Sequence, residues 1–464
     1  MSSTAETVRT PSNRRQPFPS GFTESISTGW AERPESLPAQ QRQASFAAAR
    51  RARLSSAFID KRLVIPAGAM ITRSNDTDFP FRPHSAFAYL TGWGSHAEPD
   101  SVLVLDPRRD GGHDAILHFR ERADRTSTEF YSNAAIGEFW IGPRGTLTQV
   151  AAELGVATAA LDDFTETDGD VTLGEDASLT EFLAEMRLVK DDWEIDQLRT
   201  AVDVTARGFN DIVTNLPRIV EHPRGERIIE GVFHLRARSD GNREGYDTIA
   251  AAGPHACYLH WTRNDGAVLP GDLVLIDAGV ELDSFYTADI TRTIPVTGTF
   301  SPVQRRVYET VRRAADAAFA AAVPGVKFRQ VHEAAMAVIA EAVAEWGLIP
   351  VSAEQALDAD TGGQHRRYMV HGTSHHLGID VHDCAQARRE MYYDGVLQPG
   401  MVFTIEPGLY FQIDDLTVPE ELRGIGVRIE DAILITATGP VNLSADIPRT
   451  ADEVEAWVAN ATKQ

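Results

Sequence analysis

Cysteine is scarce in this chain: among 464 residues only Cys257 and Cys384 occur. Two isolated cysteines exclude a disulfide framework, and they lack the paired spacing of a zinc ribbon or finger. A reducing compartment is therefore expected. Cys384 closely follows His382 and could confer sensitivity to thiol reagents, but a small core residue is the simpler interpretation.

Long apolar runs and excess positive charge are also missing. No run approaches the roughly 20 residues that span a bilayer, and the first residues lack the continuous apolar segment of a secretory signal. The formal net charge of −23 repels phosphate backbones and anionic lipid surfaces. We therefore predict a cytoplasmic protein with neither a nucleic-acid nor a membrane partner.

The length favours two domains, preceded by an arm. The arm, residues 1–37, is rich in Ser, Thr, Pro and Arg and is either disordered or docked, through its isolated aromatic residues, on its own core or a neighbouring subunit. Residues 38–184 combine an Ala- and Arg-rich helix with short β-like runs, which predicts a smaller α/β domain. Within it, Asp76 is either a solvated loop residue or a ligand for a substrate amino group.

Residues 185–464 carry the stronger helix and strand signals. The segment around 184–209 has apolar residues at helical spacing and opens the second domain. Ser301 and Pro302 predict a helix start, and another helix ends at Gly347. Runs such as LVLIDAGV and GMVFTIEPGLYF predict strands, so we expect an α+β architecture for this part of the chain.

Four carboxylates occur in these strand-like runs, where an unpaired buried charge costs several kcal/mol. Asp277 follows Leu-Val-Leu-Ile, Asp289 lies in a second strand, Glu406 ends a strand stopped by Pro-Gly, and Glu430 shares a strand face with Arg428. Any one alone would more often be a surface residue or a salt bridge. Four together predict that something compensates them.

Histidines cluster in the segment HGTSHHLGIDVHD, which contains His371, His375, His376 and His382. Clustered histidines with several carboxylates form a candidate metal site. Four carboxylates and one neutral imidazole balance two divalent ions in charge. Oxygen-rich ligation favours Mn²⁺, although Co²⁺ or Zn²⁺ could also bind. Two such ions suit hydrolysis of a carbonyl compound.

The ordered segments LIDAG, ADITRT, HGTSHHLGIDVHD, TIEPGLY and RGIGVRIED resemble the pita-bread metallopeptidases, especially the Xaa-Pro aminopeptidase (aminopeptidase P) family. The match spans roughly residues 185 to 460. RSNDTDFPFRPHSAFAYLTGW also resembles the amino-terminal domain of those enzymes. The resemblance implies a C-terminal pita-bread catalytic domain preceded by a smaller, creatinase-like α/β domain.

The resemblance also implies the roles of the ligands. Asp277 would bind one metal, Asp289 and Glu430 would bridge both, and His375 and Glu406 would complete the two shells. Glu406 would act in addition as general base or proton shuttle.

Five further residues match family positions beside the metals. His260, His371 and His382 would position substrate and stabilise the tetrahedral intermediate, and Arg428 and Tyr410 would support the site.

Two departures from the family pattern stand out. Asp277 and Asp289 are one residue further apart than the family leads us to expect, which implies an extended turn or bulge between their strands. His376 occupies a position where related enzymes often carry a large aromatic residue, and we interpret it as structural.

The expected activity is hydrolysis of the bond between an N-terminal residue and a penultimate proline, in a homodimer or homotetramer whose amino-terminal domain restricts access to short or unstructured peptides. Prolidase, which accepts only Xaa-Pro dipeptides, is the alternative. A non-catalytic pita-bread binding protein and a creatinase-like hydrolase are less consistent with a complete ligand set.

Overall fold

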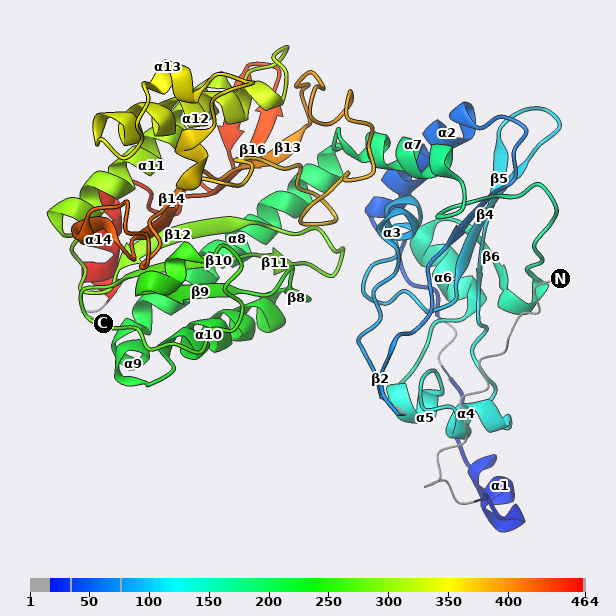
Figure 1. Ribbon diagram of the computed structural model, residues 1–464. Coiled ribbons are helices and arrows are strands. Elements are labelled where there is room, and N and C mark those ends of the chain that lie inside the picture. Colours follow the sequence, from blue (N-terminus) through cyan, green and yellow to red (C-terminus); the bar gives the residue numbers. More distant parts are fainter. Residues whose placement is uncertain (1–16, 34–35, 76, 462–464) are drawn as a thin grey trace. The chain divides into compact units, whose positions relative to one another are not determined.

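The computed structural model describes residues 17–33, 36–75 and 77–461, so Asp76 lies outside the described residues. The chain forms two compact units that divide between Leu179 and Thr180 (Figure 1). Helix α7 (Ala177–Arg187) contains this division. The domain boundary placed after residue 184 from the sequence stays a prediction.

A mixed five-stranded sheet forms the centre of the first unit, in the order β6-β5-β4-β1-β7. Strands β1, β4 and β5 pair antiparallel, whereas β6 and β7 run parallel to their neighbours. Buried side chains from the sheet and from α2 fill the core, including Leu54, Ile65, Leu103 and Phe119. The elements of this unit are α1 (Ser20–Ile26), α2 (Gln43–Ala57), β1 (Leu63–Pro66), β2 (Thr72–Ser74), β3 (Thr77–Asp78), α3 (Ser85–Thr91), β4 (Val102–Pro107), β5 (His113–Phe119), α4 (Thr128–Ser132), α5 (Glu138–Ile141), α6 (Leu147–Leu154), β6 (Ala157–Ala160) and β7 (Val171–Thr172).

The described part of the arm docks on this same unit. Phe18 and Phe22 stack on each other at 4.9 Å, and both rings meet the edge or face of Tyr131 at 5.0 and 5.3 Å. Trp30 contacts Phe130 in the same way at 5.6 Å. Of the two interpretations of the arm, docking on its own core therefore holds for residues 17–33.

The second unit packs long helices against several short antiparallel sheets (Figure 1). The largest are β12-β10-β9 and β13-β16-β17. The two-stranded pair β14-β15 comes between β13 and β16 in the sequence. The predicted α+β architecture is confirmed. The elements are α8 (Asp192–Thr214), α9 (Leu216–Glu221), α10 (Gly225–Asp240), β8 (Arg243–Glu244), β9 (Ile249–Ala252), β10 (Leu273–Ala278), β11 (Val280–Glu281), β12 (Ile290–Pro295), α11 (Pro302–Ala321), α12 (Arg329–Glu345), α13 (Ala353–Ala356), β13 (Val402–Ile405), β14 (Gly408–Tyr410), β15 (Gly426–Arg428), β16 (Asp431–Thr436), β17 (Gly439–Asn442) and α14 (Ala451–Ala461).

The helix starts follow local sequence. Ser301 caps α11 by accepting a hydrogen bond from the Gln304 backbone N–H, as its position before Pro302 predicts. The segment of continuous helical spacing around 184–209 is instead two helices, because Asp191 forms a capping box with Glu194 and starts α8 anew.

A buried ion pair ties the short connection between α7 and α8 to a distant loop. Lys190 Nζ and Arg187 Nε donate to the two carboxylate oxygens of Asp383 at 3.1 and 3.0 Å. Asp383 N–H in turn donates to the His376 carbonyl at 2.9 Å. The loop between the two histidine positions 376 and 382 is therefore held from inside the fold.

Gly279, between β10 and β11, is required by a close approach of two backbone segments. A Cβ placed on it would lie 1.6 Å from the backbone oxygen of Ala288 and 2.6 Å from the carbon of that carbonyl. Because both atoms belong to backbone, relief requires the strands to separate.

We predict that Gly279→Ala lowers the free energy of unfolding of the second unit by at least about 3 kcal/mol, because the clash cannot be relieved by a side-chain rotation. Gly231→Ala is the matched control: Gly231 lies within α10, and apart from its chain neighbours and the backbone of its own helix no atom lies within 4 Å of the position that a Cβ would take there. That change should stabilise by about 1 kcal/mol. Calorimetric unfolding of both variants checks the opposite signs, and equal effects would contradict the argument.

Candidate metal centre

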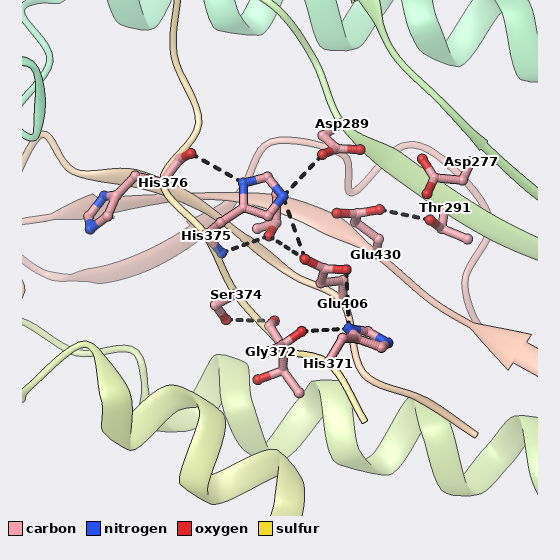
Figure 2. A network of polar contacts seen from close by, with 12 residues as sticks. Asp277, Asp289, Thr291, His371, Gly372, Ser374, His375, His376, Glu406 and Glu430 are labelled. Atoms are coloured by element: carbon pink, nitrogen blue, oxygen red, sulfur yellow. Dashed lines mark hydrogen bonds and ion pairs between the residues drawn. The ribbon is translucent and has the colours of Figure 1, made fainter. Parts of the chain in front are cut away.

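A cavity of about 620 Å³ in the second unit collects the predicted site residues. All ten of them except Tyr410 line it, and Tyr410 contacts two of the lining residues, His371 and Arg428. The lining residues predicted from the sequence are His260, Asp277, Asp289, His371, His375, His382, Glu406, Arg428 and Glu430. Figure 2 shows six of these residues gathered from separate strands and loops: Asp277, Asp289, His371, His375, Glu406 and Glu430.

Two of the carboxylates come from the hairpin formed by β10 and β12. Asp277 lies in β10 opposite Thr291 of β12. The prediction that Asp289 lies within the second strand is wrong by one residue, since β12 begins at Ile290. The segment between β11 and β12 contains a turn in which Phe285 adopts a left-handed backbone with φ of 69°.

The other two carboxylates stand at strand ends. Glu406 directly follows β13, where Pro407 stops the ladder as predicted. Glu430 lies between β15 and β16, and its Oε2 accepts a hydrogen bond from the Thr291 hydroxyl at 2.7 Å. At a strand end the pairing of the preceding residues holds the backbone in place, and the side chain projects beyond the sheet. Each of these carboxylates therefore reaches the same cavity.

His375 presents one ring nitrogen to the carboxylates. Its Nδ1 lies 3.2 Å from the carbonyl oxygen of His376 and donates to it. This bond commits Nδ1 to the backbone, and Nε2 faces Asp289 Oδ2, 3.2 Å away, and Glu406 Oε1, 3.5 Å away (Figure 2). A backbone carbonyl that fixes the Nδ1–H tautomer is the usual arrangement of a metal-binding histidine.

The crowded carboxylates perturb one another. Burial, with the charges of Asp289 and Glu406, raises the pKa of Glu430 well above its usual value. Burial, opposed by His375 and reinforced by Asp289, raises the pKa of Glu406 to about 7. Although burial disfavours its charged form, the carboxylates of Asp289 and Glu406 raise the pKa of His375 to about 9. The cavity therefore holds an excess of negative charge that favours a bound cation.

The donor set fits divalent ions. Asp289, His375 and Glu430 each offer a ligand atom, and these atoms all lie within 4.8 Å of one another. Asp277 joins this group through the Tyr246 hydroxyl, which lies 2.6 Å from Asp277 Oδ1 and 2.5 Å from Asp289 Oδ1. Oxygen ligands with a single imidazole suit Mn²⁺, Co²⁺ or Zn²⁺.

A chain of hydrogen bonds orients His371. Its Nδ1 donates to the Gly372 carbonyl at 2.6 Å, and its Nε2 accepts from the Tyr410 hydroxyl at 2.8 Å. Arg428 donates to the Tyr410 oxygen at 3.2 Å and pairs with Asp277. Burial and the charge of Arg428 lower the pKa of His371 to about 3. His371 is therefore held neutral with a fixed tautomer.

The remaining histidines divide into two groups. His382 lies at the cavity with its ring 4.4 Å from that of His375, and His260 lines the same cavity. His376 instead points away from the carboxylates (Figure 2). Its buried ring stacks on Phe328 at 4.6 Å. Burial lowers the pKa of His376 to about 3, which matches its interpretation as a structural residue.

Both cysteines are buried, and neither lines the cavity. Burial raises the pKa of the Cys257 thiol to about 12 and also raises that of Cys384. Because the thiolate is the reactive form, these environments agree with the interpretation of Cys384 as a small core residue.

Tyr246 is a functional candidate that the sequence analysis missed. It lies in an unremarkable segment, Gly-Tyr-Asp-Thr, between β8 and β9, and its two carboxylate neighbours follow 31 and 43 residues later. Burial, together with the charges of Asp277 and Asp289, raises its pKa well above the usual value, so the phenol stays protonated. No local pattern could have indicated this contact.

Comparison with known proteins places this site in a family. Residues 196–437 match the model of metallopeptidase family M24, and residues 47–173 match the model of the aminopeptidase P N-terminal domain. The Xaa-Pro aminopeptidases 1 and 2 of Streptomyces coelicolor are 49% and 50% identical, over 94% and 93% of this chain and 92% and 94% of their own lengths.

Solved structures agree. The Pseudomonas aeruginosa aminopeptidase PepP superposes with a TM-score of 0.78 at 31% identity, covering 91% of this chain and 99% of that one. A variant of Escherichia coli aminopeptidase P in complex with substrate gives a TM-score of 0.78 at 30% identity, covering 92% and 100%.

The chain therefore belongs to metallopeptidase family M24 and carries its pita-bread domain behind an aminopeptidase P N-terminal domain. Its class within that family is Xaa-Pro aminopeptidase, a metallo-exopeptidase. Among the described helices, none combines the length and the apolar composition needed to cross a bilayer.

Glu226 of α10, also missed from the sequence, organises the loop that carries His260. Its carboxylate is fully buried and accepts four hydrogen bonds. The donors flank His260 on both sides and comprise Ala252 N, His255 Nδ1, Trp261 Nε1 and Gly266 N, at 2.8, 2.8, 2.9 and 2.7 Å. A carboxylate offers enough lone pairs for all four donors, whereas an amide does not.

We predict that Glu226→Gln lowers kcat/KM about tenfold with unchanged metal content, because the loop loses acceptors and His260 shifts. Glu230→Gln is the control on the same helix, where Glu230 forms only a half-exposed pair with Arg227 at 3.8 Å. Steady-state kinetics with elemental analysis checks this. Loss of metal from the Glu226 variant would contradict a role confined to the loop.

Proposed function

We propose that the chain removes an N-terminal residue that precedes proline, using two divalent metal ions held by Asp277, Asp289, His375, Glu406 and Glu430. The observation that carries the proposal is the convergence of four carboxylates and of Nε2 of one histidine, whose Nδ1 is held by a backbone carbonyl, on a single cavity. Buried carboxylates in such number need cations to be stable.

The assignment of ligands follows the family pattern. Asp277 would hold one ion, Asp289 and Glu430 would bridge both, and His375 and Glu406 would complete the set. When bound, such ions lower the pKa of a water molecule and polarise the substrate carbonyl. The hydroxyl groups of Thr291 and Tyr246 already orient Glu430 and the two aspartates.

Glu406 is the proposed proton carrier. Its Oε1 faces His375, and its Oε2 lies 3.7 Å from His371 Nδ1. Glu406 would accept the proton of the attacking water and deliver it to the proline nitrogen, which has no N–H of its own until it leaves.

The histidines around the cavity would hold the peptide. His371 is fixed by Tyr410 and Gly372, and His260 and His382 stand as further hydrogen-bonding groups along the wall. Arg428, paired with Asp277 and donating to Tyr410, would keep both in place rather than touch the substrate.

Three finer points complete the proposal. Mn²⁺ is the proposed metal, supported by the oxygen-rich donor set, while a zinc-substituted form of the Escherichia coli enzyme exists in complex with product. A homodimer or homotetramer is proposed from the family resemblance. Cytoplasmic localisation is proposed from the scarcity of cysteine, which suits a reducing compartment.

We predict that Asp289→Ala reduces bound metal from about two ions per chain to less than one and kcat/KM by at least about a hundredfold, because a bridging ligand serves both ions. Asp414→Asn, a change at an exposed aspartate, is the charge-matched control. Elemental analysis after dialysis measures the metal. Retention of both ions by Asp289→Ala would show that the bridging assignment is wrong.

The activity itself is tested with the metal-stripped protein, with and without added Mn²⁺, on Xaa-Pro, Xaa-Pro-Yaa and Xaa-Ala-Yaa. We expect metal-dependent release of the first residue from Xaa-Pro-Yaa and none from Xaa-Ala-Yaa. Cleavage of the dipeptide alone would replace this function by prolidase. Absence of cleavage despite bound metal would support the non-catalytic alternative.

A further inference from the structure

A second cavity, of about 670 Å³, adjoins the metal centre. It lies between α12 and the segments 356–366 and 371–374, and it shares the lining residues His371, Gly372 and Ser374 with the first cavity. Figure 2 shows these three residues grouped on one side of Glu406, with Asp289 on the other. The two cavities therefore meet at the loop that carries His371.

The wall between the cavities is fixed in position. On the side of the second cavity, His332 of α12 accepts a hydrogen bond from Thr373 N at 3.2 Å and contacts the Thr373 hydroxyl at 3.1 Å. At Gly372 the wall carries no side chain, and a Cβ there would meet only Ser374 O, at 4.0 Å. At Gly372 a peptide could pass from one cavity to the other without meeting a side chain.

The direction of the substrate follows from Glu406. Because Glu406 delivers the proton to the leaving nitrogen in the proposed function, the proline must lie within reach of its carboxylate. One oxygen of that carboxylate faces the metal ligand His375, and the other faces His371. The chain beyond the proline is therefore directed toward His371 and the cavity behind it.

The lining of the second cavity suits a short peptide end. Phe328, Met336 and Leu357 supply apolar surface. The lining acids are already engaged: Glu333 pairs with Arg329 at 3.0 Å.

Asp358, the second acid in this lining, accepts two hydrogen bonds from Thr361. Arg366 lines the same cavity, is exposed, and forms no ion pair within the described part of the chain. A further polar atom lies there, since Nδ1 of His365 has no hydrogen-bond partner among the described residues and the side chain is only 5% exposed.

We propose that the second cavity binds the residues that follow the proline, and that Arg366 pairs with the C-terminal carboxylate of a short peptide. This proposal rests on the proposed function, because it uses the direction that Glu406 gives to the leaving group. An exposed guanidinium without a carboxylate partner is the group best suited to a peptide carboxylate.

The test compares Xaa-Pro peptides of two to five residues, each as free acid and as C-terminal amide, on the metal-loaded full chain and on Arg366→Ala. Among the free acids of three to five residues, we expect one peptide length at which KM rises about fivefold in Arg366→Ala while kcat stays unchanged. Dipeptides and amides should be unaffected, and Arg366→Lys should restore most of the affinity.

Arg367→Ala is the matched control, since this neighbouring arginine is paired with Asp415 at 2.8 Å and does not line the cavity. Ala359→Trp, at an exposed lining position, tests the cavity without the charge: it should raise KM for long acids and amides alike and spare the dipeptide.

Equal effects of Arg366→Ala on acids and amides, or on dipeptides and longer peptides, would overturn the proposal while leaving the activity intact. Cleavage of no Xaa-Pro peptide by the unmodified chain would instead overturn the proposed function, and this proposal with it.

Discussion

The repulsion among four buried carboxylates is the constraint on which the rest of the second unit depends. Arg428 neutralises one of them, and the single histidine among them faces two others through Nε2, so that, despite its burial, their charges raise the pKa of its ring to about 9. Without cations, the repulsion is relieved by binding protons, which is why the pKa values of Glu406 and Glu430 are raised. Divalent cations satisfy it at neutral pH without protonation.

The fold meets this constraint by placing every ligand where the backbone or a hydrogen bond holds it. The carboxylates stand in or at the ends of strands, and hydroxyl groups such as those of Tyr246 and Thr291 hold their oxygens. The loops are fixed from beneath by buried charges: Asp383, with its two cationic partners, holds the histidine loop, and Glu226 holds the loop of His260. Burying these charges is unfavourable, but it keeps the ligands in place before the metal arrives.

The ligands were predictable because each one violates the local pattern: an acid in an apolar strand is visible without a structure. Asp289 was misplaced by one residue because strand ends depend on pairing, which the sequence does not state. The break between α7 and α8 was missed because the helical spacing of apolar residues continues across it. The capping box formed by Asp191 and Glu194 can nevertheless be recognised in the sequence. Tyr246 and Glu226 could not be found, because their partners are distant or surround a loop.

Peptide length, which the motifs leave open, is decided by what lies beyond the proline. An enzyme limited to dipeptides needs a barrier or a fixed cation directly behind that residue, so that a longer chain is rejected. Here the edge behind His371 is a glycine with open space at its Cβ position, and a further cavity of about 670 Å³ follows. Arg366, which donates to the Val370 carbonyl at 3.3 Å and has no carboxylate partner among the described residues, lies in that further cavity rather than among the residues lining the metal centre. The shape of the leaving side therefore favours peptides longer than two residues over a prolidase.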